Sequence, residues 1–301
     1  MPLFSPFRRS PIPTPGSRSR VPIKLIIAVL IAGFVLVRYF SSSTSNPVTG
    51  QTQRVALSPE QERALGLRAA PEMAQQMGGL SSDGAATARV KSVGQAIVRA
   101  FTPEITDFAK DYQFDYHLLA DRQTVNAFAL PGGQIFITEA LYARLETEGQ
   151  LAGVLGHETG HVLGRHSAQQ MAKGQMLQGL VGAATVAGSD ASDGGRTAQA
   201  VSGMVANMFQ LKYGRNDELE ADKLGLTLMH RAGYDPRALI RVMQILEQAS
   251  GGTSRQPEFA SSHPNPGNRI AQIEAELQRL FPSGGPAGGT GGTGGTGGLK
   301  P

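Results

Sequence analysis

Few sequence patterns restrict a fold as tightly as the segment His157-Glu158-Thr159-Gly160-His161 in this chain. If the segment is helical, residues four apart lie on the same face, so the imidazoles of His157 and His161 can bind one metal ion. Glu158 can then reach a water molecule on that ion, which is the arrangement of a zinc peptidase. A helix is indicated by apolar residues that recur at steps of three and four, namely Leu151, Val154, Leu155 and Val162.

The third metal ligand must come from outside this segment, because a catalytic zinc ion takes three protein ligands and keeps one position open for water. In one class of zinc peptidase the motif continues as HxxGxxH, and Gly164 fits that pattern, but the next ligand position holds Ser167. His166 lies one residue too early. We therefore expect His166 to be a surface or capping residue near the helix end.

An acidic run at residues 216–225 supplies the other candidates, and it reads as the start of a second helix. Glu218 and Asp222 are four residues apart and share a helix face. Glu218 can bind the metal while Asp222 accepts a hydrogen bond from a ligand imidazole. We expect Glu220, which points elsewhere, to be a solvated charge in the first helical turn.

Four blocks of the sequence resemble the zinc metallopeptidase family of HtpX and the CAAX prenyl proteases. The similarity is greatest to its small membrane-associated or periplasmic bacterial members, which are related to the mitochondrial Oma-type protease. The pairing of HExxH with a downstream ExxxD is much more specific than HExxH alone. The blocks occupy roughly residues 112 to 270, and they are residues 126–133, 157–166, 213–222, and His263-Pro264 with Arg269.

This resemblance implies one Zn²⁺ per subunit, bound by His157, His161 and Glu218, with Glu158 as the general base and Asp222 behind the ligands. It also places His263 and Arg269 near the metal as catalytic residues that stabilise the oxyanion. Alternatively, His263 occupies the fourth zinc position in a latent state, or the two residues belong only to a surface loop.

A substrate-binding strand is implied at Asn126, Ala127, Phe128 and Ala129. Independently, residues 125–130 and 134–138 are two short apolar runs around Pro131-Gly132-Gly133, which predicts a hairpin. An exposed edge of this hairpin could pair with an extended peptide through backbone hydrogen bonds that do not depend on sequence.

The N-terminal 40 residues carry six Arg or Lys and no Asp or Glu, around an apolar run at residues 25–37. We expect a basic cytoplasmic segment at 1–20, a signal anchor at 21–40 and a linker at 41–57. This organisation places a single-pass protein in a bacterial inner membrane with its catalytic domain in the periplasm. The alternative is a cleaved signal peptide and a secreted or periplasmic protein.

The predicted fold class is α+β, with a mostly helical, gluzincin-like zinc metallopeptidase domain at 58–281 and a small β-sheet bordering the active-site cleft. We expect a helix start at Ser58-Pro59-Glu60, a helix at 85–100 and a strand at 114–120. Residues 169–211, rich in Gly and Ala, favour two closely packed helices, whose apolar face could instead cover the cleft or touch the bilayer. The Gly/Thr-rich segment 282–301 is expected to be a flexible tail.

The sequence therefore favours an endopeptidase that hydrolyses unfolded or damaged envelope proteins, attached to the membrane by its N-terminal anchor. The chain has no cysteine, which excludes a thiol nucleophile. Its basic pI of about 9.5 comes from the N-terminal charges, because the rest of the chain has a net charge of −2 when the whole carries +4, so no nucleic-acid partner is expected. The alternative function is a latent protease that acts mainly as a holdase at its edge strand, with a regulatory protein partner.

Overall fold

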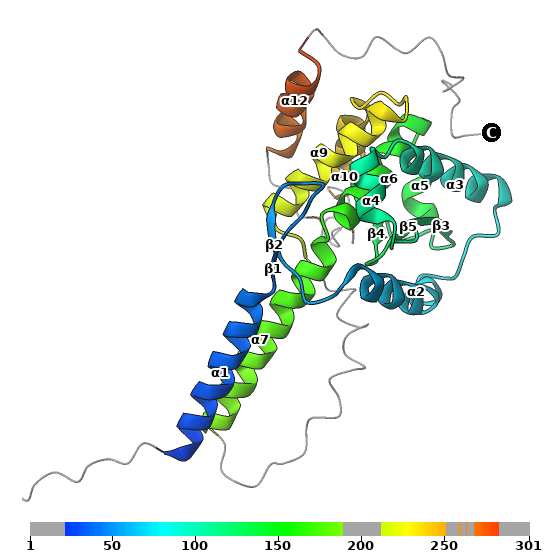
Figure 1. Cartoon of the computed structure of the whole chain (residues 1–301). Helices are drawn as coiled ribbons and strands as arrows, with labels where there is room; N and C mark the ends of the chain where they lie inside the picture. The colour runs from blue at the N-terminus through cyan, green and yellow to red at the C-terminus, as the bar shows by residue number, and fades with distance from the viewer. Residues whose placement is uncertain (1–21, 189–211, 251–258, 260–262, 264–267, 283–301) are drawn as a thin grey trace, which may run out of the picture.

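The computed structural model describes residues 22–188, 212–250, 259, 263 and 268–282 (Figure 1). These residues are mostly helical and contain a two-stranded and a three-stranded sheet, which confirms the predicted α+β class. The basic segment 1–20, most of the tail 282–301 and the second half of 169–211 lie outside the described residues.

Helix α6, Glu148–Leu163, runs through the centre of the folded body and carries the HExxH segment. The Thr147 hydroxyl accepts a hydrogen bond from the Gln150 N–H and so caps the helix start, as the sequence indicates. We expected one apolar stripe, but every residue of the range 150–163 is buried. The reason is that α3 (Gly84–Arg99), α9 (Arg215–Arg231) and α10 (Ala238–Ser250) surround it.

The three-stranded sheet lies beside α6 and has the order β3-β5-β4. Strand β3, Asp115–Leu119, pairs in parallel with β5, Gln134–Thr138, and β4, Ala127–Ala129, pairs antiparallel with β5. The turn between β4 and β5 places Gly132 at φ 80° and Gly133 at φ 111°, which residues with side chains rarely adopt. The predicted hairpin is confirmed, and β4 is an edge strand.

Helix α2, Pro59–Gln76, begins where the sequence indicates, with Ser58 and Gln61 forming a reciprocal capping box. Two short helices follow at α4, Pro103–Ala109, and α5, Glu139–Tyr142. The helix predicted at 85–100 is α3 and the strand predicted at 114–120 is β3. Helix α12, Arg269–Leu280, packs on α9 and α10.

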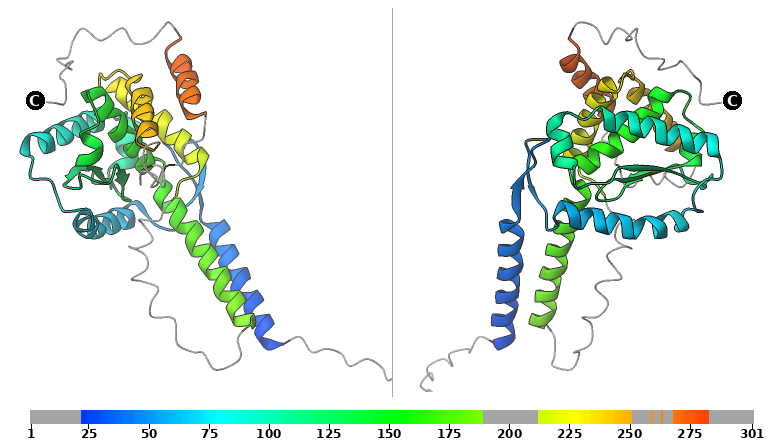
Figure 2. Two further views of the ribbon diagram at one scale, coloured as in Figure 1. Left: turned by 180° about the vertical axis from the view of Figure 1, so that it is seen from behind. Right: turned by 45° about the vertical axis from the view of Figure 1, so that its right-hand side comes forward.

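Two long helices leave the body side by side (Figures 1 and 2). Helix α1, Ile23–Ser41, enters the body at its C-terminal end, and α7, His166–Gly188, leaves it at its N-terminal end, so the two run antiparallel. Among the described helices, α1 alone is long and apolar enough to cross a membrane, judged by its length and composition.

The segment 41–57, expected to be a linker, contains a small hairpin of β1, Ser43–Ser45, and β2, Thr52–Arg54. Its turn is docked onto the body, because the buried Asn46 side chain donates a hydrogen bond to the Leu163 carbonyl at 2.8 Å. The base of α1 is therefore tied to the end of α6 and does not hang on a flexible tether.

Candidate metal centre

Helices α6 and α9 supply three side chains that converge at their crossing. The Nε2 atoms of His157 and His161 are 3.1 Å apart, and the Glu218 carboxylate lies 3.6 Å from the first and 3.4 Å from the second. The helices approach closely because α6 has glycine at the contact: a Cβ on Gly160 would lie 2.6 Å from the Ala221 carbonyl oxygen. A small residue at this crossing thus allows Glu218 to reach both imidazoles.

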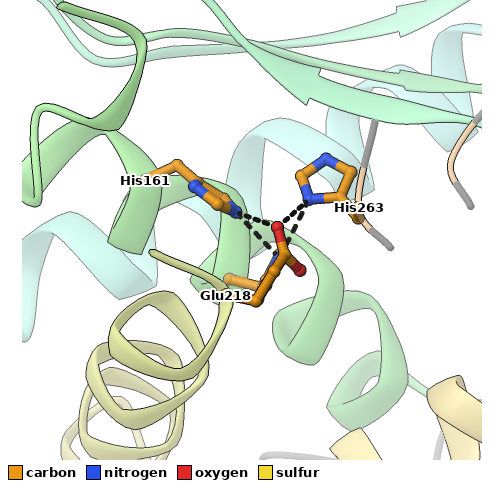
Figure 3. A group of neighbouring side chains, drawn as sticks. His161, Glu218 and His263 are labelled. Carbon is orange, nitrogen blue, oxygen red and sulfur yellow. Dashed lines mark hydrogen bonds and ion pairs between the residues drawn. The ribbon is translucent and has the colours of Figure 1, made fainter. Parts of the chain in front are cut away.

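His263 completes the group from a different part of the chain (Figure 3). Its Nδ1 lies 3.0 Å from Glu218 Oε1 and 3.4 Å from His157 Nε2. One ligand atom from each of the four side chains lies within 4.8 Å of the others, and none of the four is more than 1% exposed. The predicted ligands are brought together, and His263 stands where a fourth ligand would.

The His157 ring is oriented by a buried carboxylate and a buried guanidinium. Its Nδ1 lies 2.8 Å from Asp222 Oδ1, so an N–H at Nδ1 donates to Asp222 and leaves Nε2 free for a metal. Arg269 donates to both Asp222 oxygens at 2.7 Å and lies 2.8 Å from Glu218 Oε2. Burial opposes the charge on Asp222, but Arg269 outweighs it and lowers the pKa of the carboxyl.

The His161 ring is oriented by residues for which we expected no such position. Its Nδ1 lies 2.8 Å from Nδ1 of His166, and His166 Nε2 lies 2.9 Å from Glu220 Oε2. With the N–H of His161 on Nδ1, His166 accepts there and donates from Nε2 to the Glu220 carboxylate. The expectation of a surface His166 is wrong, since it is 1% exposed, and Glu220 is hydrogen-bonded to it and not merely solvated.

His166 faces His161 because of the backbone conformation at the end of α6. Arg165 has φ 56°, in the left-handed region, and this turns the chain so that His166 faces back toward His161. The Arg165 side chain is buried and ion-paired with Glu62 of α2. An arginine in the left-handed region leaves no periodic signal in a sequence, so this turn could not be predicted. The five-residue spacing from His161 to His166 is the one sequence signal that points to their contact.

Glu158 is fully buried beside the converging ligands, and within the described residues neither of its carboxylate oxygens has a hydrogen-bond partner. The His263 ring lies beside it, with Nε2 3.6 Å from Glu158 Oε1. Burial raises the pKa of the Glu158 carboxyl. An unpartnered buried carboxylate is costly unless a further group completes the site, so the residues present fit a metal ion carrying a water.

The charges of the other groups also suit a metal. Burial holds the pKa of His161 well below its usual value, which keeps the ring neutral and its Nε2 lone pair free. Burial alone would raise the pKa of Glu218, but the His263 ring 3.0 Å away outweighs burial and holds the pKa well below the usual range. Neutral imidazoles with an ionised carboxylate are the ligands that zinc takes in peptidases.

The predicted substrate strand lies at the edge of the sheet and next to α6. Asn126 is buried, and so are the side chains of Ala127 and Ala129, while Phe128 stacks on Phe136 of β5 with the ring centroids 5.0 Å apart. A peptide that paired with this strand would therefore meet its backbone edge and not pockets made by these side chains.

Sequence comparisons agree with this geometry. A family model described as Peptidase family M48 matches residues 85–277. The chain is 29% identical over 245 residues to the Beta-barrel assembly-enhancing protease of Yersinia pestis, covering 78% of this chain and 48% of that protein. It is 36% identical over 168 residues to the Mitochondrial metalloendopeptidase OMA1 of Schizosaccharomyces pombe, covering 56% and 48%. The chain spans about half the length of these curated relatives.

Proposed function

The chain belongs to peptidase family M48, and from this premise we propose that it is a zinc-dependent endopeptidase in which His157, His161 and Glu218 hold the metal. The observation that carries the proposal is the buried Glu158, with no hydrogen-bond partner among the described residues, beside four converging ligand atoms. A group in that place has no evident structural role, whereas a general base must stand next to the water that it activates.

When bound, zinc lowers the pKa of a water ligand and polarises the scissile carbonyl. Glu158 takes a proton from the attacking water and returns it to the leaving amine, and its raised pKa brings it closer to neutral pH, where such a base is most effective. Asp222 and His166 hold the Nδ1–H groups of the two imidazoles and so keep both Nε2 atoms directed at the metal.

We assign Arg269 a positioning role in place of the expected oxyanion contact. Its Nε and Nη2 donate to Asp222 and its Nη1 faces Glu218, so its polar atoms are already directed at carboxylates. His263 is the better candidate for an oxyanion donor, because its Nε2 has no hydrogen-bond partner in the described part of the chain.

We also propose that the centre is latent in this conformation. A catalytic zinc ion needs an open position, yet His263 lies among the ligands and is buried. Phe259 stacks on the His263 ring with the centroids 4.4 Å apart, and its N–H lies 3.4 Å from the Val125 carbonyl oxygen, just before β4. Residues 259 and 263 thus stand between the metal ligands and the strand expected to bind a peptide, and a regulatory partner or stress would displace them.

The proposed substrates are unfolded or damaged proteins of the cell envelope. The edge of β4 suits extended chains of any sequence, and the relatives named above include a protease that enhances β-barrel assembly. Helix α1 is the proposed inner-membrane anchor, with the catalytic body in the periplasm, and removal of this segment as a signal peptide is the alternative.

The test is casein cleavage by the full chain in detergent, with Glu158→Gln and His263→Ala beside the unaltered protein. We expect Glu158→Gln to reduce the rate by about 10²- to 10⁴-fold, because it removes the general base. An increase in rate with His263→Ala would support latency, and a loss would support the oxyanion role. Binding of casein without cleavage by any of the three proteins would favour the holdase instead.

A further inference from the structure

We propose that the outer part of α7, Met176–Gly188, lies in the same bilayer as α1, so that two helices and not one attach this protein to the membrane. The inference rests on the proposed anchoring by α1. It concerns a helix that joins the metal centre directly, because α7 begins at His166, which contacts His161.

The first observation is the close packing of the two helices. A Cβ on Gly179 would lie 2.7 Å from Val35 Cγ2, so the backbone of α7 approaches the side chains of α1 without an intervening side chain of its own. Ala183, one turn further along, is buried. Small residues at a helix contact are typical of helices that pack within a membrane.

The second observation is the opposite face of α7. Leu177 is 51% exposed and Val181 is 67% exposed, as Phe34 on α1 is 68% exposed, so both helices of the pair turn apolar side chains outward. Both helices project from the body (Figures 1 and 2). Large apolar side chains exposed on both helices of a pair indicate contact with a membrane or another protein. Because α7 packs side by side with α1, the candidate membrane span, lipid is the favoured partner.

The third observation is a boundary of cationic and aromatic groups at the body end of both helices. On α1 it consists of Arg38, Tyr39 and Phe40, and the Arg54 guanidinium lies 5.5 Å and 5.1 Å from the two ring centroids. On α7 the last charged residue is the exposed Lys173. Aromatic rings and cations of this kind mark the headgroup level of a bilayer.

The two helices meet this boundary at the same level. A cavity of about 360 Å³ there is lined by Arg38 and Tyr39 from α1 and by Ala172, Gln175 and Met176 from α7. Beyond it, residues 25–37 of α1 and residues 176–188 of α7 are uncharged runs of equal length, each about 20 Å long at 1.5 Å per residue. If residues 25–37 of α1 lie in the bilayer, residues 176–188 of α7 therefore lie in it beside them, at the same depth.

Attachment through α7 would hold the metal centre at the membrane surface, since one continuous helix joins His166 to the embedded part. The metal centre could then reach only the peptide bonds of chains that lie at the membrane surface. This refines the substrate class from envelope proteins in general to segments adjacent to the bilayer.

The test uses the full chain in phosphatidylcholine–phosphatidylglycerol vesicles. Because the chain lacks cysteine, a single substitution gives one thiol for an environment-sensitive dye. The sites are Leu177→Cys and Val181→Cys on α7, Phe34→Cys as the reference for α1, and Leu80→Cys, 61% exposed on the body, as the reference for water. We expect blue-shifted emission and quenching by nitroxide lipids at both α7 sites, as at Phe34, with deeper-placed nitroxides acting more on the Val181 site.

Emission at the α7 sites like that at Leu80, with Phe34 quenched, would overturn the inference and leave the anchor intact. Absence of quenching at Phe34 as well would overturn both. A blue shift at the α7 sites without quenching by lipid would mean that protein covers this face, either the body or a second copy of the chain, and would also overturn the inference.

A disulfide tests the packing independently. The Cβ built on Gly179 lies 3.5 Å from the Val35 Cβ, which suits a disulfide, so Val35→Cys with Gly179→Cys should cross-link within one chain in vesicles. Val29→Cys with Gly179→Cys is the matched control and should remain reduced, because Val29 lies well over one turn further along α1. Equal cross-linking of both pairs, or of neither, would contradict the packing on which the inference depends.

Discussion

The imidazoles of His157 and His161 are held by different partners. Asp222 and Arg269, which hold His157, are buried, whereas the partner of His161 is His166, which in turn contacts the partly exposed Glu220. Both arrangements fix the N–H on Nδ1 and so direct Nε2 toward the proposed metal position. The two sets of partners differ in their contact with solvent. Only the set that holds His161 includes a partly exposed residue, Glu220, so it is the easier of the two to alter by substitution.

We expect His166→Ala to weaken zinc binding by about 10- to 100-fold, because the His161 Nδ1–H then lacks its acceptor and the ring can turn. Zinc affinity is measured by competition with a chromophoric chelator, and far-ultraviolet circular dichroism checks the fold. His230→Ala, on the exposed side of α9, is the control and should leave the affinity unchanged. Equal affinities for His166→Ala and the control would show that His161 needs no such support.

Most of the residues around the centre could be predicted from spacing and family resemblance, but His166 and Glu220 could not. Helical geometry correctly turns Glu220 away from Glu218, yet it does not say what Glu220 meets there. That depends on the left-handed backbone of Arg165, which is held by the buried ion pair to Glu62. A contact that depends on an ion pair between distant parts of the chain cannot be predicted from sequence periodicity.

At the level of elements, the site depends on how closely α6 and α9 cross. Gly160 of α6 faces the backbone of Ala221, and Gly225 of α9 faces the backbone of His157, where a Cβ would lie 3.0 Å from the nitrogen. Neither neighbour is a flexible side chain that can move aside. The distance between the helices therefore sets the reach of Glu218 toward the imidazoles.

We expect Gly160→Ala to lower the free energy of unfolding by about 1–3 kcal/mol, because the added methyl group overlaps the Ala221 backbone. Zinc affinity should fall with it as α9 moves away. Gly174→Ala on α7 is the matched control: no atom lies within 4 Å of its Cβ, so the substitution should be neutral or stabilise by up to about 1 kcal/mol. Thermal unfolding compares the two, and equal melting temperatures would contradict close packing at Gly160.

The sequence predicted α2, α3, α6, α9 and the β4–β5 hairpin, because each has a cap, a turn or a clear periodicity. It did not predict the β1–β2 hairpin, whose three-residue strands have Ser, Thr, Gln and Arg side chains. Such composition is typical of linkers. The hairpin owes its position to the docked Asn46, which is a tertiary contact.

For the whole molecule, the proposed metal ligands join three parts of the chain: α6, α9 and the position of His263, with α12 attached through Arg269. Glu158 and Glu218 are both buried there. Burial and the charge of Glu218 raise the pKa of the Glu158 carboxyl, and a bound cation would offset this repulsion. A ligand that binds only the folded state stabilises it by mass action, by about 4 kcal/mol at a thousand times its dissociation constant. The metal should thus contribute to stability as well as to catalysis.

We expect a chelator to lower the melting temperature of the full chain in detergent, and added zinc to restore it. Glu218→Gln should melt at the same temperature with and without zinc, because it lacks the carboxylate ligand. Differential scanning fluorimetry measures both, and a zinc-dependent shift of equal size in Glu218→Gln would argue against this ligand.

The most direct measurement is the zinc content of three purified full-length proteins after dialysis, by atomic emission spectroscopy: the unaltered chain, Glu158→Gln and Glu218→Gln. We expect one zinc per chain in the first two and a marked loss in the third, because Glu158 acts on the water and Glu218 binds the ion. No zinc in the unaltered chain, or equal zinc in all three, would contradict the assignment of His157, His161 and Glu218 as the catalytic metal site.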